Sequence, residues 1–187
     1  MGMPAFVRQW TREEVLALPE DGRRYELVDG ELLVSPSPRP IHQIAVEALM
    51  YRFAPYVRAH RLGLLLSSPA DLDLRSGQLL QPDLFVVSPV EGGMRHWAEA
   101  GIPRLVVEVL SPSTARYDRV TKRRRYQRSA VPNYWIVDCD ARVVEVWTPD
   151  AEGPTIASEV LRWQPDAALE PLNVDLAAYF AEVWGES

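Results

Sequence analysis

Two stretches of sequence decide the fold, Gln81-Pro82-Asp83-Leu84-Phe85-Val86-Val87 and Arg104-Leu105-Val106-Val107-Glu108-Val109-Leu110-Ser111-Pro112. Each contains a short run of Leu, Val or Phe bounded by proline, which is typical of a β-strand covered on both faces. Each run also carries one acid, Asp83 or Glu108. Removing an ionised carboxylate from water costs on the order of several kcal/mol unless the group is paired or binds a metal. We therefore expect both acids to have cationic partners.

Two kinds of partner are possible for these acids. One is an ion pair with arginine, or contact with solvent at the end of a strand. The other is a shared divalent metal, since carboxylates on adjacent strands can face one cation. Carboxylate oxygens, a backbone carbonyl and waters are the ligands that Mg²⁺ prefers. The pairing of two acids in neighbouring predicted strands favours a Mg²⁺ or Mn²⁺ site.

The only lysine of the chain, Lys122, follows these strands in a predicted helix. Lys and Arg together number 20, so every other basic residue is an arginine. A guanidinium stays protonated in proteins, whereas a compact ammonium acts as a point charge and titrates when buried. Lys122 is therefore either a surface residue left by compositional bias or a lysine kept for chemistry near Asp83 and Glu108.

Pro82-Asp83 followed by Glu108-Val109-Leu110 resembles the PD-(D/E)XK nuclease motif, in which lysine normally holds the place of Leu110. Families of that superfamily exist in which the lysine has moved to the following helix, where Lys122 lies. More narrowly, about residues 10–150 resemble the bacterial Uma-type family of restriction endonucleases. The segments that carry this resemblance are 25–32, 38–42, 107–114, 118–126 and 131–138.

The resemblance implies an α/β (α+β) protein with a restriction-endonuclease-like core, a mixed central sheet flanked by helices. The predicted order of helix, three strands, helix and strand agrees with that core, and an N-terminal hairpin and extra C-terminal strands are additions to it. We expect one domain over residues 1–187. The predicted helices cover 41–60, 113–130 and 174–184, with a short helix capped by Thr11. The predicted strands cover 23–28, 31–35, 62–74, the Asp83 and Glu108 stretches, 133–138, 142–148 and 155–163.

Composition limits the location and the binding partners. The chain is 47% hydrophobic, shows neither a membrane-spanning stretch nor a signal peptide, and has one cysteine, Cys139. These features favour a cytoplasmic protein without disulfides. The net charge of −6 argues against nonspecific DNA binding by the whole molecule.

Basic residues are nevertheless concentrated in the helix after Glu108. This helix is a candidate surface for the DNA backbone, or alternatively a solvated face that balances an acidic body. The candidate nucleic-acid-binding residues are Arg116, Arg119, Arg123, Arg124 and Arg125.

Two further residues are catalytic candidates beside Asp83, Glu108 and Lys122. The resemblance places an acid at Glu26, which is either a third carboxylate near the metal or a half-exposed strand residue paired with a neighbouring arginine. His42 opens the long helix after a run of prolines, and either orients a phosphate or water or caps that helix.

The resulting hypothesis is Mg²⁺- or Mn²⁺-dependent hydrolysis of a DNA phosphodiester. Asp83, Glu108 and the carbonyl of Val109 would hold the metal, and Lys122 would hold a water or stabilise negative charge. The alternatives are an inactive nuclease-like fold that serves as a binding or assembly subunit, and an RNA or repair nuclease of the same fold. We also expect that Asp83→Ala leaves the fold intact or improves it.

A double-strand cut needs two active sites, so we expect a homodimer. Its candidate contact surfaces are the loop at 88–103 and the aromatic residues of the C-terminal helix, Tyr179, Phe180 and Trp184. The alternative is that these residues pack on the core of the protein.

Overall fold

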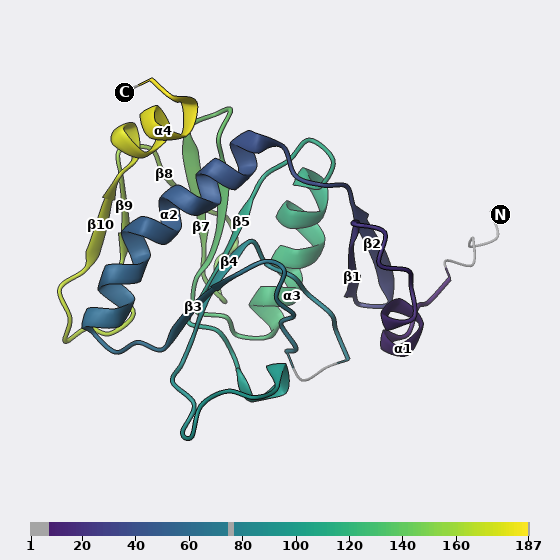
Figure 1. Ribbon diagram of the computed structural model, residues 1–187. Helices are drawn as coiled ribbons and strands as arrows, with labels where there is room; N and C mark the ends of the chain where they lie inside the picture. Colours follow the sequence, from purple (N-terminus) through teal and green to yellow (C-terminus); the bar gives the residue numbers. More distant parts are fainter. Residues whose placement is uncertain (1–7, 75–76, 187) are drawn as a thin grey trace.

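A six-stranded mixed sheet forms the centre of the computed structural model, which describes residues 8–74 and 77–186 (Figure 1). Its strand order is β3-β4-β5-β6-β7-β8. The β5–β6 pair is parallel and the other pairs are antiparallel. The strands are β3 (Leu64–Ser67), β4 (Leu84–Val87), β5 (Leu105–Val109), β6 (Tyr134–Asp138), β7 (Val143–Trp147) and β8 (Thr155–Ala157).

Alternate residues of the central strands face two different hydrophobic clusters. On one face, Leu84 and Val86 pack with helix α2 (Pro40–Ala59) and helix α4 (Leu176–Trp184). On the other face, Phe85 and Val87 pack in the cluster that contains Tyr126 of helix α3 (Arg123–Arg128). The sheet is therefore buried on both faces, as its nearly continuous apolar strands predict.

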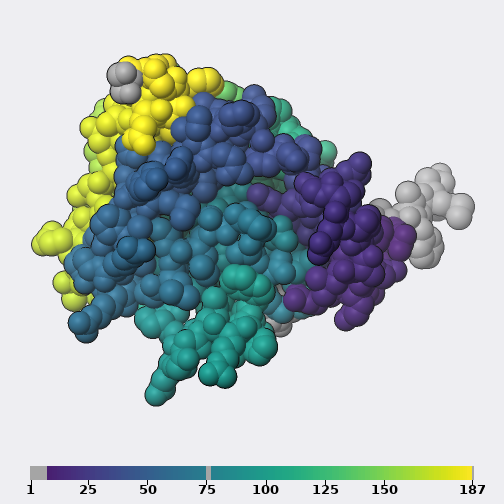
Figure 2. Space-filling view, viewed as in Figure 1, coloured from purple at the N-terminus to yellow at the C-terminus, as the bar shows by residue number. Residues whose placement is uncertain are grey.

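The N-terminal hairpin lies against one side of this body. It consists of β1 (Arg24–Val28) and β2 (Glu31–Ser35), paired antiparallel around Asp29 and Gly30, as predicted. Helix α1 (Arg12–Leu16) precedes it, with the capping box of Thr11 and Glu14 that the sequence predicts. Figure 2 shows this N-terminal part packed beside α2. A backbone bridge between Leu27 and Leu79 ties the hairpin to the body.

The strand predicted over 62–74 is much shorter than expected. β3 ends at Ser67, the Ser68-Pro69 bond is cis, and the chain then turns away so that Leu72 bridges to Leu80. Proline has no backbone N–H for the ladder, which explains why the strand stops at this point.

The C-terminal prediction also needs correction. The strand predicted over 155–163 is two strands, because after β8 the chain enters β9 (Val160–Trp163), which pairs with β10 (Leu172–Asp175) in a separate sheet. β10 was missed, and α4 begins two residues later than the predicted start at 174. Asp175 caps α4 by accepting a hydrogen bond from the Ala178 N–H.

The predicted helix over 113–130 is helical but not regular. Residues Tyr117–Lys122 form a π-helical segment, η2, that runs directly into α3, and the Arg123 N–H donates to the Asp118 carbonyl. Such π-turns are frequent at functional sites. The remaining helical element is a short 3-10 turn, η1 (Trp97–Glu99), in the loop before β5.

None of the helices in the described parts of the chain is long and apolar enough to cross a lipid bilayer.

Gly63 gives a test of the turn that leads from α2 into β3. Its φ is +124°, and a Cβ added there would meet the backbone carbonyl oxygen of Val87. We expect Gly63→Ala to lower the free energy of unfolding by roughly 2–4 kcal/mol, because it combines backbone strain with a clash against a strand. Urea unfolding measures the change.

Gly153→Ala is the matched control, since an added Cβ there meets no atom within 4 Å. We expect it to change stability by less than about 1 kcal/mol. Equal effects of both substitutions would contradict the description of this turn.

Candidate active site

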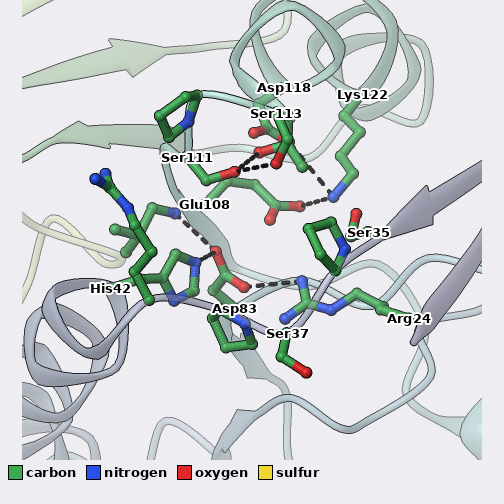
Figure 3. Close-up of a pocket in the computed structure, with 16 residues that line it drawn as sticks. Arg24, Ser35, Ser37, His42, Asp83, Glu108, Ser111, Ser113, Asp118 and Lys122 are labelled. Carbon is green, nitrogen blue, oxygen red and sulfur yellow. Dashed lines mark hydrogen bonds and ion pairs between the residues drawn. The ribbon is translucent and has the colours of Figure 1, made fainter. Parts of the chain in front are cut away.

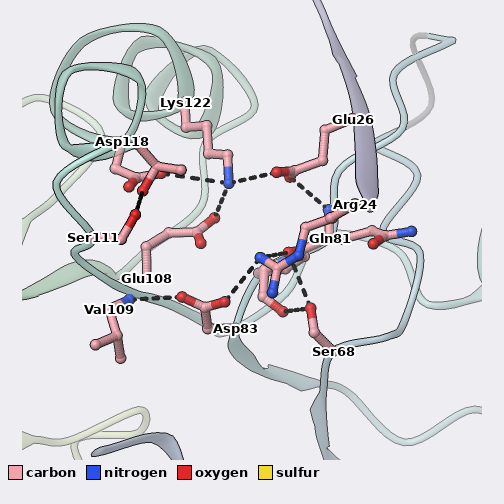
Figure 4. Close-up of polar contacts among 12 residues, drawn as sticks. Arg24, Glu26, Ser68, Gln81, Asp83, Glu108, Val109, Ser111, Asp118 and Lys122 are labelled. Carbon is pink, nitrogen blue, oxygen red and sulfur yellow. Dashed lines mark hydrogen bonds and ion pairs between the residues drawn. The ribbon is translucent and has the colours of Figure 1, made fainter. Parts of the chain in front are cut away.

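The two strand acids lie side by side at the point where β4 begins and β5 ends. Leu84 pairs with Val107, so the same antiparallel register places Asp83, one residue before β4, opposite Glu108. Directly opposed residues of an antiparallel pair point to the same face of the sheet. Figure 4 shows both carboxylates directed toward one cluster of polar side chains. Sequence reasoning predicted this juxtaposition, and the register explains it.

Asp83 is held by three donors. Its Oδ1 accepts from Arg24 Nη1 at 2.9 Å, and its Oδ2 lies 3.0 Å from His42 Nε2 and 2.8 Å from the Val109 backbone nitrogen. Burial raises the pKa of Asp83, but the bond to His42 and the charges of His42, Arg24 and Lys122 outweigh it and lower that pKa below its usual value.

The expectation that Asp83→Ala leaves the fold intact or improves it is therefore wrong in its premise. It assumed an unpaired buried charge, whereas the Asp83 carboxylate has Arg24 and His42 as partners. Removing it would leave the Arg24 guanidinium without its charged partner and the Val109 N–H without its acceptor, which costs stability.

The Lys122 amine points into the same cluster, not into solvent. Its Nζ lies 3.0 Å from Glu108 Oε1, 3.0 Å from Glu26 Oε2 and 3.4 Å from Asp118 Oδ1. The side chain is buried, which lowers its pKa, but the surrounding carboxylates raise the pKa well above the usual value. The interpretation of Lys122 as a chance surface lysine is thus excluded, and the group is an ammonium.

The cluster contains more buried carboxyl groups than buried cations. Burial raises the pKa of Glu108 well above its usual value, and the neighbouring carboxylates add to that effect against the opposing charge of Lys122. The pKa of Asp118 is raised for the same reasons, burial first. Such a cluster attracts any further cation.

The predicted metal ligands are consistent with this charge. Within residues 8–74 and 77–186, no three His, Cys, Asp or Glu side chains form a group that could hold a metal. A set of two carboxylates, the Val109 carbonyl and waters does not require three such side chains. A strand residue sends its N–H and C=O toward the same neighbour. The Val109 carbonyl therefore lies on the Asp83 side of β5, where its N–H binds. The donor set thus fits a hard divalent cation.

Asp83, Glu108 and Lys122 line a cavity of about 260 Å³ (Figure 3). Two proline-containing loops form its walls, Ser35–Arg39 after β2 and Ser111–Thr114 after β5. Ser111 Oγ lies 3.0 Å from Ser113 Oγ and 2.9 Å from Thr114 Oγ1, so the second wall is lined with hydroxyls. The cavity offers a substrate both hydroxyl and cationic groups above the carboxylates.

The structure decides between the alternative positions expected for Glu26 and for His42. Glu26 is fully buried, with Oε1 accepting from the Gln81 N–H at 2.9 Å, so it is not a half-exposed strand residue. His42 does not cap α2, whose N-cap is Arg39, and its ring lies against Asp83. The structure brings both residues into the cluster that contains Lys122 and Asp83.

The predicted DNA-binding arginines are mostly engaged elsewhere. Arg119 pairs with Asp138 and Glu145 at 2.9 and 2.6 Å. Arg123 lies over the Trp147 ring and Arg125 pairs with Asp29. Arg116 and Arg124 are exposed. The prediction gave all five arginines the same role, but successive residues of a helix point in different directions, so these guanidinium groups lie in different surroundings.

Sequence reasoning missed two members of the cluster, Arg24 and Asp118. Arg24 is two residues before Glu26 on β1, and the period of a strand places both on one face. Asp118 lies four residues before Lys122, which places both on one side of the helical segment. Both spacings were available as signals.

The fold and the buried polar cluster define a protein with a restriction-endonuclease-like architecture, as predicted. The chain matches the model of the Uma2 family, described as "Putative restriction endonuclease", over residues 12–178. The chain belongs to this family, and the resemblance seen in the sequence is confirmed.

Its structure is similar to the crystal structure of "a putative nuclease belonging to DUF820" from Anabaena variabilis, with a TM-score of 0.74 and 19% sequence identity. That similarity covers 93% of this chain and 99% of the other, and at this identity it shows a shared fold. No curated protein matches the chain significantly.

Lys122→Met tests the buried cluster. Without the ammonium, Glu26, Glu108 and Asp118 lose their shared cation, and we expect the free energy of unfolding to fall by about 3–5 kcal/mol at pH 8. Acids whose pKa is raised in the folded state bind protons more readily than in the unfolded state. The loss should therefore shrink as the pH falls toward 5.

Arg124→Met is the control, since Arg124 is exposed on the following helix. We expect it to change stability by less than about 1 kcal/mol at every pH. Urea unfolding of both variants across this pH range decides the matter, and a small, pH-independent loss for Lys122→Met would contradict the role given to its amine.

Proposed function

We propose that this protein is a divalent-metal-dependent nuclease that hydrolyses phosphodiester bonds in DNA. The observation that supports this most strongly is the convergence of Asp83, Glu108 and the Lys122 amine from three separate segments in one cavity. Membership of a family described as restriction endonucleases supports the same reaction class.

Asp83, Glu108 and the carbonyl of Val109 would hold Mg²⁺ or Mn²⁺. A bound divalent ion supplies a Lewis acid for a phosphoryl oxygen and lowers the pKa of a bound water. The excess of buried carboxyl groups over buried cations in this cluster is the local feature that supports such an ion.

The chain's own residues would act by position and charge. Because its pKa is raised, Lys122 is protonated, so it would donate hydrogen bonds to a water or to oxygens that gain negative charge, and would not act as a general base. His42 touches Asp83 and would position that carboxylate. Glu26 and Asp118 hold the Lys122 amine from the sides away from Glu108.

The second candidate is a nuclease-like subunit that binds or assembles without cutting. It is favoured by the ion pairs that engage Lys122 with three carboxylates and by Leu110 in the usual lysine position. An RNA or repair nuclease of the same fold would use the same groups on another substrate.

Cleavage assays test the reaction. With Mg²⁺ or Mn²⁺, we expect the purified protein to nick or cut double-stranded DNA, and Asp83→Asn and Glu108→Gln to reduce the rate at least about 100-fold. Lys122→Arg keeps the positive charge but should also lack activity, because a guanidinium is wider than an ammonium and differs from it in geometry. Single-stranded DNA and RNA are tested in parallel.

Glu182→Gln is the control, since this carboxylate pairs with Arg52 on the α2–α4 side and should leave the rate unchanged. A folded wild-type protein that binds DNA but cuts none of these substrates would favour the binding subunit. Cleavage of RNA alone would favour the RNA nuclease.

Metal binding gives a second test that does not depend on cleavage. A ligand that binds only the native state adds about 2.7 kcal/mol at 100 times its Kd. For a chain of this size that raises Tm by roughly 5–10 °C. We expect Mn²⁺ to raise Tm of the wild type by several degrees and to have little effect on Glu108→Gln. The same shift in both proteins would place the ion elsewhere.

We further propose that the protein acts in the cytoplasm as a homodimer. The buried free thiol of Cys139 is compatible with a reducing compartment. Tyr179 and Phe180 pack on the core, which is the alternative to a dimer contact, whereas Trp184 is 42% exposed. Light scattering at micromolar concentration should give twice the chain mass of 21.2 kDa, and a strictly monomeric mass would remove the dimer.

A further inference from the structure

Arg24 differs from the other charged residues of the cluster in its exposure. Its side chain is 20% exposed, whereas that of Lys122 is 2% exposed and that of Asp83 is 3% exposed. A negatively charged group that enters the cavity would therefore meet the Arg24 guanidinium before it reaches the Lys122 amine.

Arg24 also lies at the junction of two hollows. Together with His42 and Asp83 it lines the main cavity of about 260 Å³ and a smaller one of about 100 Å³. The smaller hollow continues along α2 past Gln43 and Glu47 toward Ser67 and Ser68. A strand bound across the carboxylates would pass over the Asp83–Arg24–His42 bridge to reach it.

The guanidinium has donors left for such a ligand. Within the described chain, Nη1 makes both hydrogen bonds of this side chain, to Asp83 Oδ1 at 2.9 Å and to the Gln81 carbonyl at 3.1 Å. An arginine carries five N–H donors in a planar fork. Nη2 and Nε can thus bind an anion while Nη1 keeps its bonds to the protein.

Charge keeps this guanidinium in place and protonated. Burial lowers the pKa of Arg24, but the charges of Asp83, Glu26 and Glu108 outweigh that effect and raise it. A planar, permanently charged fork with a fixed anchor matches the geometry of phosphate oxygens.

We propose that Arg24 binds a phosphate of the substrate strand next to the one that is cut, at the junction of the two hollows. This inference rests on the proposed nuclease function and adds a phosphate-binding residue supplied by the N-terminal hairpin. The principal phosphate contact is thus assigned to β1 and not to the arginines of the basic helix. Several of those arginines are engaged in ion pairs.

The salt dependence of DNA binding tests this assignment. Each phosphate neutralised by a basic side chain contributes about −0.9 to the slope of log K against log[salt] for duplex DNA, and about −0.7 for single strands. We expect Arg24→Gln to make that slope less negative by about this amount for a fluorescently labelled oligonucleotide. The titrations are made without divalent metal, so that no cleavage intervenes.

Arg142→Gln is the matched control, because it removes one arginine charge from a pair with Glu186 outside both hollows. We expect its slope to equal that of the wild type. A purely structural role for Arg24 would weaken folding, measured by thermal unfolding, without changing the slope. An unchanged slope in folded Arg24→Gln would overturn the assignment.

Arg24→Lys covers the case in which Arg24→Gln does not fold. The ammonium keeps a charge for Asp83 but lacks the fork, so we expect an unchanged slope with affinity reduced about 3- to 10-fold. Wild-type affinity in this variant would contradict the proposal.

The outcomes for the two proposals are separable. A slope change in Arg24→Gln with no cleavage by the wild type would support the phosphate contact and overturn hydrolysis. Cleavage by the wild type with an unchanged slope in Arg24→Gln would support hydrolysis and overturn the phosphate contact of Arg24. Failure of the wild type to bind any oligonucleotide would overturn both.

Discussion

The rest of the site depends on one buried ammonium. Lys122 Nζ joins Glu26 of β1 and Glu108 of β5, and it also contacts Asp118 of its own helical segment, η2. None of these carboxylates reaches solvent, so their charges are compensated inside the protein or by an ion that enters. These ion pairs therefore link the hairpin, the end of β5 and the helical segment that follows it.

The sheet supplies the second constraint on the site, because β5 extends two residues beyond the last residue that pairs with β4. The ladder between them stops at Leu84 and Val107, and the Val109 N–H binds the Asp83 carboxylate in place of a strand carbonyl. Two acids can therefore face each other at the margin of an otherwise apolar pair of strands. The carboxylates that would bind metal are oriented by the strand register and by the donors that hold Asp83, and a preorganised site of this kind favours catalysis.

The hairpin joins the fold to the proposed function. Through Glu26 it reaches the buried lysine, and through Arg24 it reaches the surface of the cavity, so one strand serves both the interior and the substrate side. Figure 4 shows the two side chains approaching the cluster from the same strand. The N-terminal hairpin thus completes the buried cluster.

The sequence alone determined the order of the main elements as far as β8, the Asp29-Gly30 hairpin and the grouping of Asp83, Glu108 and Lys122, because these signals are local: apolar runs, turn residues and acids where burial is costly. Tertiary structure decided the rest. The partners of Asp83, the burial of Glu26 and the engagement of Arg119 with Asp138 and Glu145 depend on which segments meet across the sheet. Charge pairing between distant segments leaves no periodic trace in the sequence, so spacing alone could not separate the arginine that faces the cavity from those that hold the fold together.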